Sequence, residues 1–146
     1  MKRLLITLIA LCTLATAEAQ RQRYNFNSDW NITFADPDTN PSAEAKKVTL
    51  PHAWNEDYAF MVEIRQHPDA EVWYRKTFSL PASDAGKHVI VEFEGARQAA
   101  EVWINGHRLG LHENGVMAFG FDLTPYINYA GENVLKVRTD NDWTYR

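Results

Sequence analysis

Cysteine is almost absent from this sequence, whose 146 residues include only Cys12. One cysteine cannot form a disulfide within the chain, so the fold depends on its core or on a larger partner. The five histidines show neither H-x-H nor H-E-x-x-H spacing and therefore predict no zinc site. Asp140-Asn141-Asp142 offers oxygen ligands but lacks the glycine and the distal glutamate of a calcium loop. We expect no metal and no cofactor.

Clustered positive charge and glycine-rich segments are also missing. No run of basic residues is longer than two, and the formal net charge is −4. Nucleic-acid binding needs a clustered positive face, so we expect no nucleic-acid partner. The seven glycines are scattered singly and form no phosphate-binding loop, and no G-x-S-x-G motif marks a nucleophilic serine. The chain is also too short for an α/β barrel, which needs about 250 residues.

The N-terminus has the pattern of a targeting segment. Two basic residues after Met1 precede an apolar run of about a dozen residues, and Ala17-Glu18-Ala19 is a typical cleavage site. The run is too short for a membrane span, which takes about 20 apolar residues. A bulky residue before Cys12 disfavours a lipoprotein. The sequence predicts a signal peptide over residues 1–19, a mature domain over 20–146, and export to the periplasm or the extracellular space.

Alternating apolar and polar residues predict β-strands along most of the remaining chain. In 71–80, Val72, Tyr74 and Phe78 share one face, although Lys76 interrupts it. Further strands are expected over 30–35, 47–50, 88–94, 100–104, 107–111, 118–122 and 133–139. Asn105-Gly106 predicts a type I′ hairpin, because both residues tolerate positive φ. Six to eight short strands separated by turns predict an all-β sandwich of two sheets.

Three connecting or terminal segments carry separate expectations. Thr124 before Pro125 is typical of a helix N-cap, so a short helical turn is expected over 124–128. The stretch 52–68 has no clear period and is expected to be a long loop. The sequence stops at residue 146, just beyond a strong strand, which would leave a sheet edge exposed. We therefore expect the fold to be C-terminally incomplete, as a fragment of a longer protein.

Carboxylates are the candidates for acid–base chemistry. Glycosidic bond cleavage uses two of them, and Glu92 and Glu94 project from the same face of one strand at a spacing of about 7 Å. Glu101 on the following strand is a candidate for the same chemistry. Any alternating strand offers this spacing, so a solvated outer face is the expected environment.

Tryptophans are candidates for contact with sugars, whose apolar ring faces stack on aromatic side chains. Trp30 and Trp73 lie in predicted strands and are expected in the core, whereas Trp103 is compatible with either face. Trp54 and Trp143 lie in or beside loops that also contain aspartate and asparagine. This composition is suited to carbohydrate.

Six stretches occur in the order found in a known family. They are Val-Thr-Leu-Pro-His-Ala-Trp-Asn at 48–55, Trp-Tyr-Arg-Lys-Thr-Phe at 73–78, Phe-Glu-Gly-Ala at 93–96, Glu-Val-Trp-Ile-Asn-Gly at 101–106, Phe-Gly-Phe-Asp-Leu-Thr at 119–124 and Asn-Val-Leu-Lys-Val-Arg at 133–138. Together they resemble the N-terminal sugar-binding domain of glycoside hydrolase family 2, the group of β-galactosidases, β-glucuronidases and β-mannosidases. The resemblance implies a jelly-roll β-sandwich of the galactose-binding-domain-like type. Asn114-Gly115-Val116 differs from the Gly-Gly-Tyr often found in the family, which points to a subgroup.

The same resemblance implies where the chemistry resides. In the family, the catalytic glutamates belong to a separate α/β barrel several hundred residues downstream, so the three glutamates above inherit no catalytic role. The jelly roll contributes part of the wall of the sugar pocket. The matching positions are Asp140 and Asn141, near the hydroxyls of the terminal sugar, and more weakly Asp69, before the Trp-Tyr-Arg stretch.

The sequence thus predicts the sugar-binding domain of an exported glycoside hydrolase that acts on terminal β-linked sugars, above all β-galactosides. The expected partners are carbohydrate and the downstream domains of the parent enzyme. By itself the chain is expected to show no turnover and to bind free sugar weakly, because one wall of a pocket cannot desolvate a ring. The alternatives are a stand-alone carbohydrate-binding module, which would need an exposed aromatic platform, and an inert fold remnant.

Overall fold

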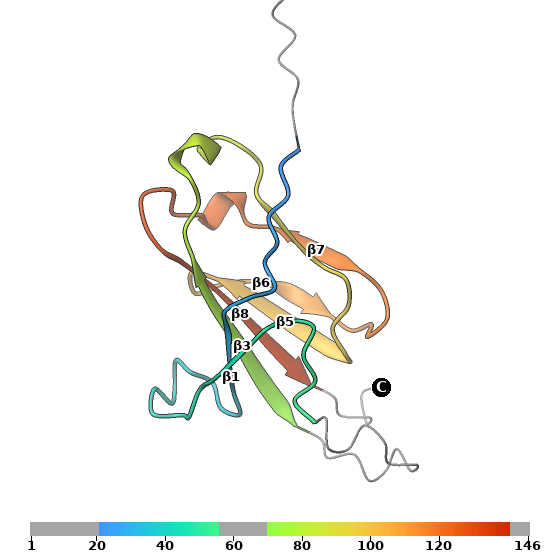
Figure 1. Cartoon of the computed structure of the whole chain (residues 1–146). Helices are drawn as coiled ribbons and strands as arrows, with labels where there is room; N and C mark the ends of the chain where they lie inside the picture. Colours follow the sequence, from blue (N-terminus) through green and yellow to red (C-terminus); the bar gives the residue numbers. More distant parts are fainter. Residues whose placement is uncertain (1–20, 56–69, 141–146) are drawn as a thin grey trace, which may run out of the picture.

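The computed structural model describes residues 21–55 and 70–140, which form strands and short 3₁₀ turns (Figure 1). The strands are β1 (Trp30–Thr33), β2 (Lys46–Val48), β3 (Glu71–Phe78), β4 (Ile90–Phe93), β5 (Ala99–Ile104), β6 (His107–His112), β7 (Phe119–Asp122) and β8 (Asn133–Asp140). The 3₁₀ turns are η3 (Ala82–Asp84) before β4 and η4 (Thr124–Tyr126) before β8. The predicted signal peptide and most of the predicted 52–68 loop lie outside the described residues.

Antiparallel pairing assembles these strands into two sheets. The larger sheet has the order β2-β1-β3-β8-β5-β6, and the smaller one pairs β4 with β7. β3 and β8 pair along their whole length, from Glu71 opposite Asp140 to Phe78 opposite Asn133. Figure 1 shows β7 on the opposite side of the fold from β1, β3 and β8. The predicted all-β sandwich of two sheets is confirmed.

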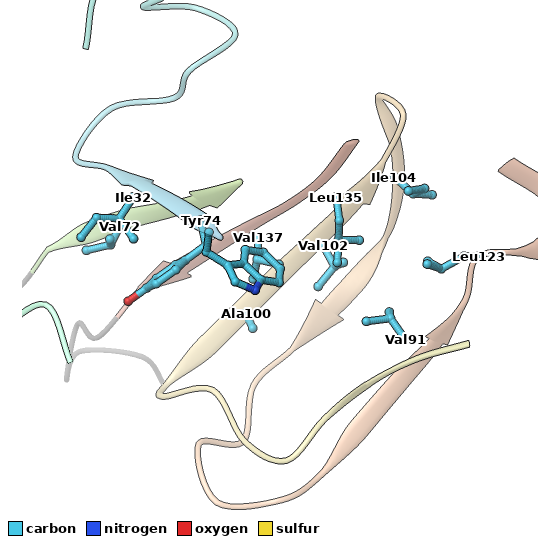
Figure 2. Close-up of a cluster of buried hydrophobic side chains, with 11 residues drawn as sticks. Ile32, Val72, Tyr74, Val91, Ala100, Val102, Ile104, Leu123, Leu135 and Val137 are labelled. Carbon is cyan, nitrogen blue, oxygen red and sulfur yellow. The ribbon is translucent and has the colours of Figure 1, made fainter. Parts of the chain in front are cut away.

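The core lies between the two sheets because successive side chains of a strand point to opposite faces. Every second residue of β3, β5 and β8 therefore faces inward. The buried members are Val72, Tyr74, Ala100, Val102, Ile104, Leu135 and Val137. Figure 2 shows Val91 from β4 and Leu123, which follows β7, facing this layer from the other side. Full burial of one such aliphatic side chain contributes about 1.5–3 kcal/mol.

The Asn105-Gly106 hairpin is confirmed. Asn105 has φ 49° and Gly106 has φ 82°, the positive values that a type I′ turn needs. The Asn105 side chain also fastens the turn to its neighbours. Its Oδ1 accepts the N–H of Val134 at 2.8 Å, and its Nδ2 donates to the carbonyl of Tyr126 at 2.7 Å.

The turn predicted at Thr124 is present but is built differently. It ends at Tyr126 instead of residue 128, and Thr124 is its first residue, not its cap. The hydroxyl of Thr124 accepts the N–H of Val89 at 2.8 Å, while Asp122 accepts the N–H of Thr124 at 2.9 Å. The threonine thus joins the chain just before β4 to the end of β7.

Trp73 is buried, as expected, but on the outer face of the larger sheet. Its ring centroid lies 5.4 Å from that of Trp103, so Trp103 belongs to the same outer face. Nζ of Lys136 lies 4.8 Å from the centre of the Trp73 ring and pairs with Asp36 at 3.1 Å and with Asp38. The segment after β1 therefore covers Trp73. As a result, β3 has buried side chains on both faces of the sheet.

Candidate functional site

Asp140 lies where three strands of the larger sheet meet at one edge. As the last residue of β8, it is opposite Glu71, the first residue of β3, and opposite Ala99, the first residue of β5. In an antiparallel pair, the chain that enters one strand and the chain that leaves the other lie at the same edge. The structure therefore places Asp140 near the middle of this edge. The other two predicted sugar contacts, Asn141 and Asp69, lie outside the described residues.

Two hydrogen bonds hold the end of β8 in place. The N–H of Gln98 donates to the carbonyl of Asp140 at 2.9 Å. The hydroxyl of Thr139 donates to the carbonyl of Val72 at 3.2 Å. Asp140 itself is partly buried. Its position relative to β3 and β5 is therefore fixed by the sheet.

Charged side chains on the outer face run across the strands beside this edge. Arg138 donates to Glu71 at 3.1 Å and to Glu101 at 3.0 Å. Arg108 also donates to Glu101, and the indole N–H of Trp73 donates to Glu71 at 2.7 Å. Both oxygens of Glu101 are thus held by guanidinium groups. The expectation of a solvated carboxylate was therefore wrong for Glu101.

Glu92 is also paired, at the other side of the molecule. Arg23 and Arg21 donate to its two oxygens at 3.0 Å and 2.6 Å. These guanidinium groups hold the pKa of the Glu92 carboxyl below its usual value. A general acid needs a raised pKa near the working pH, so Glu92 does not have the environment of a glycosidase acid.

An open hollow of about 520 Å³ lies next to Asp140. Its lining residues come from the connection between β4 and β5 and from the connection between β6 and β7. They are Arg97, Gln98, Glu113, Asn114, Gly115 and Val116. Gly115 allows the two connections to touch, because a Cβ at this position would lie 3.2 Å from Cα of Arg97. Val116 keeps 89% of its surface exposed.

An aromatic group lies at the β1 side of the same edge. Phe34 follows β1, is 62% exposed, and meets the Trp54 ring edge-to-face at 5.8 Å between centroids. Trp54 is half-buried and packs against the core. Nearby, Nδ1 of His52 lies 3.2 Å from the Tyr74 hydroxyl, whose pKa burial raises to about 12. Trp143, the other predicted loop tryptophan, lies outside the described residues.

The sequence profile of "Glycosyl hydrolases family 2, sugar binding domain" matches residues 25–144. The chain belongs to this family. The match includes both sheets, the hollow and Asp140, so the family resemblance of the six stretches is confirmed.

Curated relatives support this assignment. The chain is 39% identical over 142 residues to a β-glucuronidase of Formosa agariphila, with 89% of this chain and 14% of the relative covered. It is 35% identical over 150 residues to the β-galactosidase BoGH2A of Bacteroides ovatus, with 91% and 17% covered. A solved β-glucuronidase from glycoside hydrolase family 2 superposes with a TM-score of 0.73 at 34% identity, covering 88% of this chain and 15% of that one. The chain thus spans about one sixth or less of these relatives.

This family 2 sugar-binding domain has further features that the motifs did not predict. The hollow joins residues separated by a whole hairpin, and no local pattern relates Arg97 to Asn114. Within residues 21–55 and 70–140, no three His, Cys, Asp or Glu side chains are grouped to hold a metal. The same described ranges contain no helix long and apolar enough to cross a membrane.

Proposed function

We propose that the chain supplies part of the wall of a saccharide pocket in an exported glycoside hydrolase. Family membership supports the sugar-binding role, and the relatives described above are named β-glucuronidase and β-galactosidase. The proposed substrate class is the one that these names share, a terminal β-linked pyranose. The predicted signal peptide supports export.

The position of Asp140 is the observation that carries this proposal. Its carboxylate stands at the end of β8, at an edge that β3 and β5 also reach. A carboxylate can accept hydrogen bonds from two vicinal sugar hydroxyls, and the sheet holds its backbone in place. In the proposal, Asn141 and Asp69 contribute further polar contacts to the same sugar.

Bond cleavage is assigned to groups outside this chain. Retaining and inverting glycosidases both need two carboxyl groups that face one glycosidic bond. Among the described residues, Glu92 and Glu101 are held in ion pairs on separate faces of the fold. The chain is therefore proposed to bind and orient sugar, and further domains of the parent enzyme are proposed to hydrolyse it.

Titration of the ¹⁵N-labelled chain with methyl β-galactoside and methyl β-glucuronide tests this function. We expect weak, millimolar binding with amide shifts that are largest at Asp140 and its pairing partners. Asp140→Asn should abolish these shifts, whereas Glu132→Gln, an exposed carboxylate before the other end of β8, should leave them unchanged. Amide shifts that persist in Asp140→Asn, or hydrolysis of a chromogenic β-glycoside by the chain alone, would contradict the proposal. Micromolar affinity would instead favour a stand-alone binding module.

A further inference from the structure

We propose that the hollow next to Asp140 binds the second sugar ring of a β-linked oligosaccharide. This inference rests on the proposed function, because the first ring is the one placed at Asp140. It adds a subsite and narrows the substrate class, from any glycoside with a terminal β-linked sugar to di- and oligosaccharides.

The two positions are neighbours in the sheet. Asp140 pairs with Ala99, and Ala100 pairs with His112, the residue before the hollow-lining loop. Two strand spacings therefore separate Asp140 from the start of that loop, a distance of about 10 Å. Gln98 lies in this interval, since its N–H donates to the carbonyl of Asp140 and the residue also lines the hollow. The hollow is thus within reach of a ligand held at Asp140.

The lining has the chemistry that a sugar ring needs. Gln98 and Asn114 offer amide groups, while Arg97 and Glu113 contribute one positive and one negative charge. The formal charges cancel, which suits a neutral polyhydroxylated ligand better than a phosphate or a peptide of one charge sign. Val116, with its exposed side chain, provides an apolar surface for the C–H face of a ring.

The connection between β6 and β7, which carries Glu113, Asn114 and Val116, is held at both ends. His112 stacks on Phe119 with ring centroids 4.1 Å apart, and Phe119 stacks on Phe93 at 4.8 Å. Inside the loop, Asn114 Oδ1 accepts the N–H of Val116 at 3.0 Å, which fixes the amide plane. Binding to such a preformed loop requires little ordering of the protein.

The test compares one-ring and two-ring ligands on the chain. Lactose should bind about tenfold more tightly than methyl β-galactoside, the gain expected for one or two added hydrogen bonds with some apolar contact. The same ratio is expected for a β-glucuronosyl disaccharide against methyl β-glucuronide. Gln98→Ala, which keeps the backbone bond to Asp140, and Val116→Ser should each reduce this advantage at least threefold. Neither should change the affinity for the one-ring glycosides. Gln22→Ala, at an exposed position in the N-terminal segment, is the matched control.

The outcomes separate this inference from the proposed function. Equal affinity for lactose and methyl β-galactoside, with binding lost in Asp140→Asn, overturns the second-sugar site and leaves the proposed function standing. Disaccharide binding that depends on Gln98 but not on Asp140 supports a saccharide site in the hollow and overturns the placement of the first ring. Tighter binding of p-nitrophenyl β-galactoside than of lactose, dependent on Val116, overturns the inference in favour of an apolar aglycone site. Absence of binding by every ligand overturns both.

Discussion

The backbone N–H of Gln98 donates a hydrogen bond to the carbonyl oxygen of Asp140 at 2.9 Å. This bond joins the connection before β5 to the end of β8, although 42 positions separate the two residues in the sequence. Gln98 also lines the hollow. The proposed first and second sugar positions are therefore joined through this hydrogen bond. A displacement of either connection at the hollow is therefore expected to reach Asp140.

Gly115→Ala tests the contact between the two hollow-lining connections. The added Cβ would lie 3.1–3.3 Å from three atoms of Arg97, one of them the backbone Cα, so the loop must shift. We expect a loss of about 1 kcal/mol, at the lower end of overpacking costs, and amide shifts that extend to Gln98 and Asp140. Thermal unfolding and ¹⁵N spectra measure both effects. Gly95→Ala is the control, because its Cβ would meet only the Gly115 carbonyl at an ordinary 3.6 Å. Equal effects of the two variants would contradict the close-approach argument.

Lys76→Met tests the buried cation on the core face of β3. Lys76 is 7% exposed, donates to the carbonyl of Ser28, and lies 4.8 Å from the centre of the Phe26 ring. Methionine preserves most of the stem but leaves the Ser28 carbonyl without this donor, so we expect a loss of about 1–2 kcal/mol. Lys76→Ala should cost more, because it also removes the packing of the stem. Urea unfolding measures the difference, with the exposed Lys47→Met as control. A more stable Lys76→Met would show that desolvation of the ammonium outweighs its contacts.

The decrease in the free energy of unfolding at acid pH should depend on Asp84. Lys87 donates to this carboxylate at 2.7 Å and Tyr24 at 3.0 Å, which together hold its pKa below the ordinary value of 3.8. The folded state thus prefers the ionised form. The associated stability is present above pH 3.8 and is lost as the pH falls through the lower, folded-state pKa.

Asp84→Asn should therefore flatten the decline in unfolding free energy below pH 3.8, and Tyr24→Phe should flatten it partly. Urea titrations across the acid range measure the slopes. Glu132→Gln serves as the exposed control. If the unfolding free energy of Asp84→Asn falls with pH as steeply as that of the unchanged protein, this carboxylate is not a source of the pH dependence.

The sequence predicted those parts of the fold that depend on local rules. The strand alternation around Val72 and Tyr74 and the positive φ values at Asn105 and Gly106 both arise within a few residues. The features it missed depend on distant partners. The hydroxyl of Thr124 accepts the N–H of Val89 and does not cap its own turn. Trp73 is covered by the segment that contains Asp36 and not by the core between the sheets. The family resemblance marked Asp140 as a sugar contact, but its position beside β3 and β5 was not predicted, because strand pairing has no local sequence signal.

Asn105 separates the contribution of backbone conformation from that of side-chain hydrogen bonds. Asn105→Gly keeps the positive φ but removes the bonds to Val134, Tyr126 and Asn133. At about 0.5–1.5 kcal/mol for each of the three bonds, the expected loss is about 1.5–4.5 kcal/mol. Asn105→Ala removes the same bonds and also places a Cβ at φ 49°, so it should lose about 1 kcal/mol more. Thermal unfolding ranks the variants, and faster hydrogen exchange at the Val134 amide reports the lost bond in both. If the two variants are equally stable, the side-chain bonds alone select asparagine here, and the positive φ adds nothing.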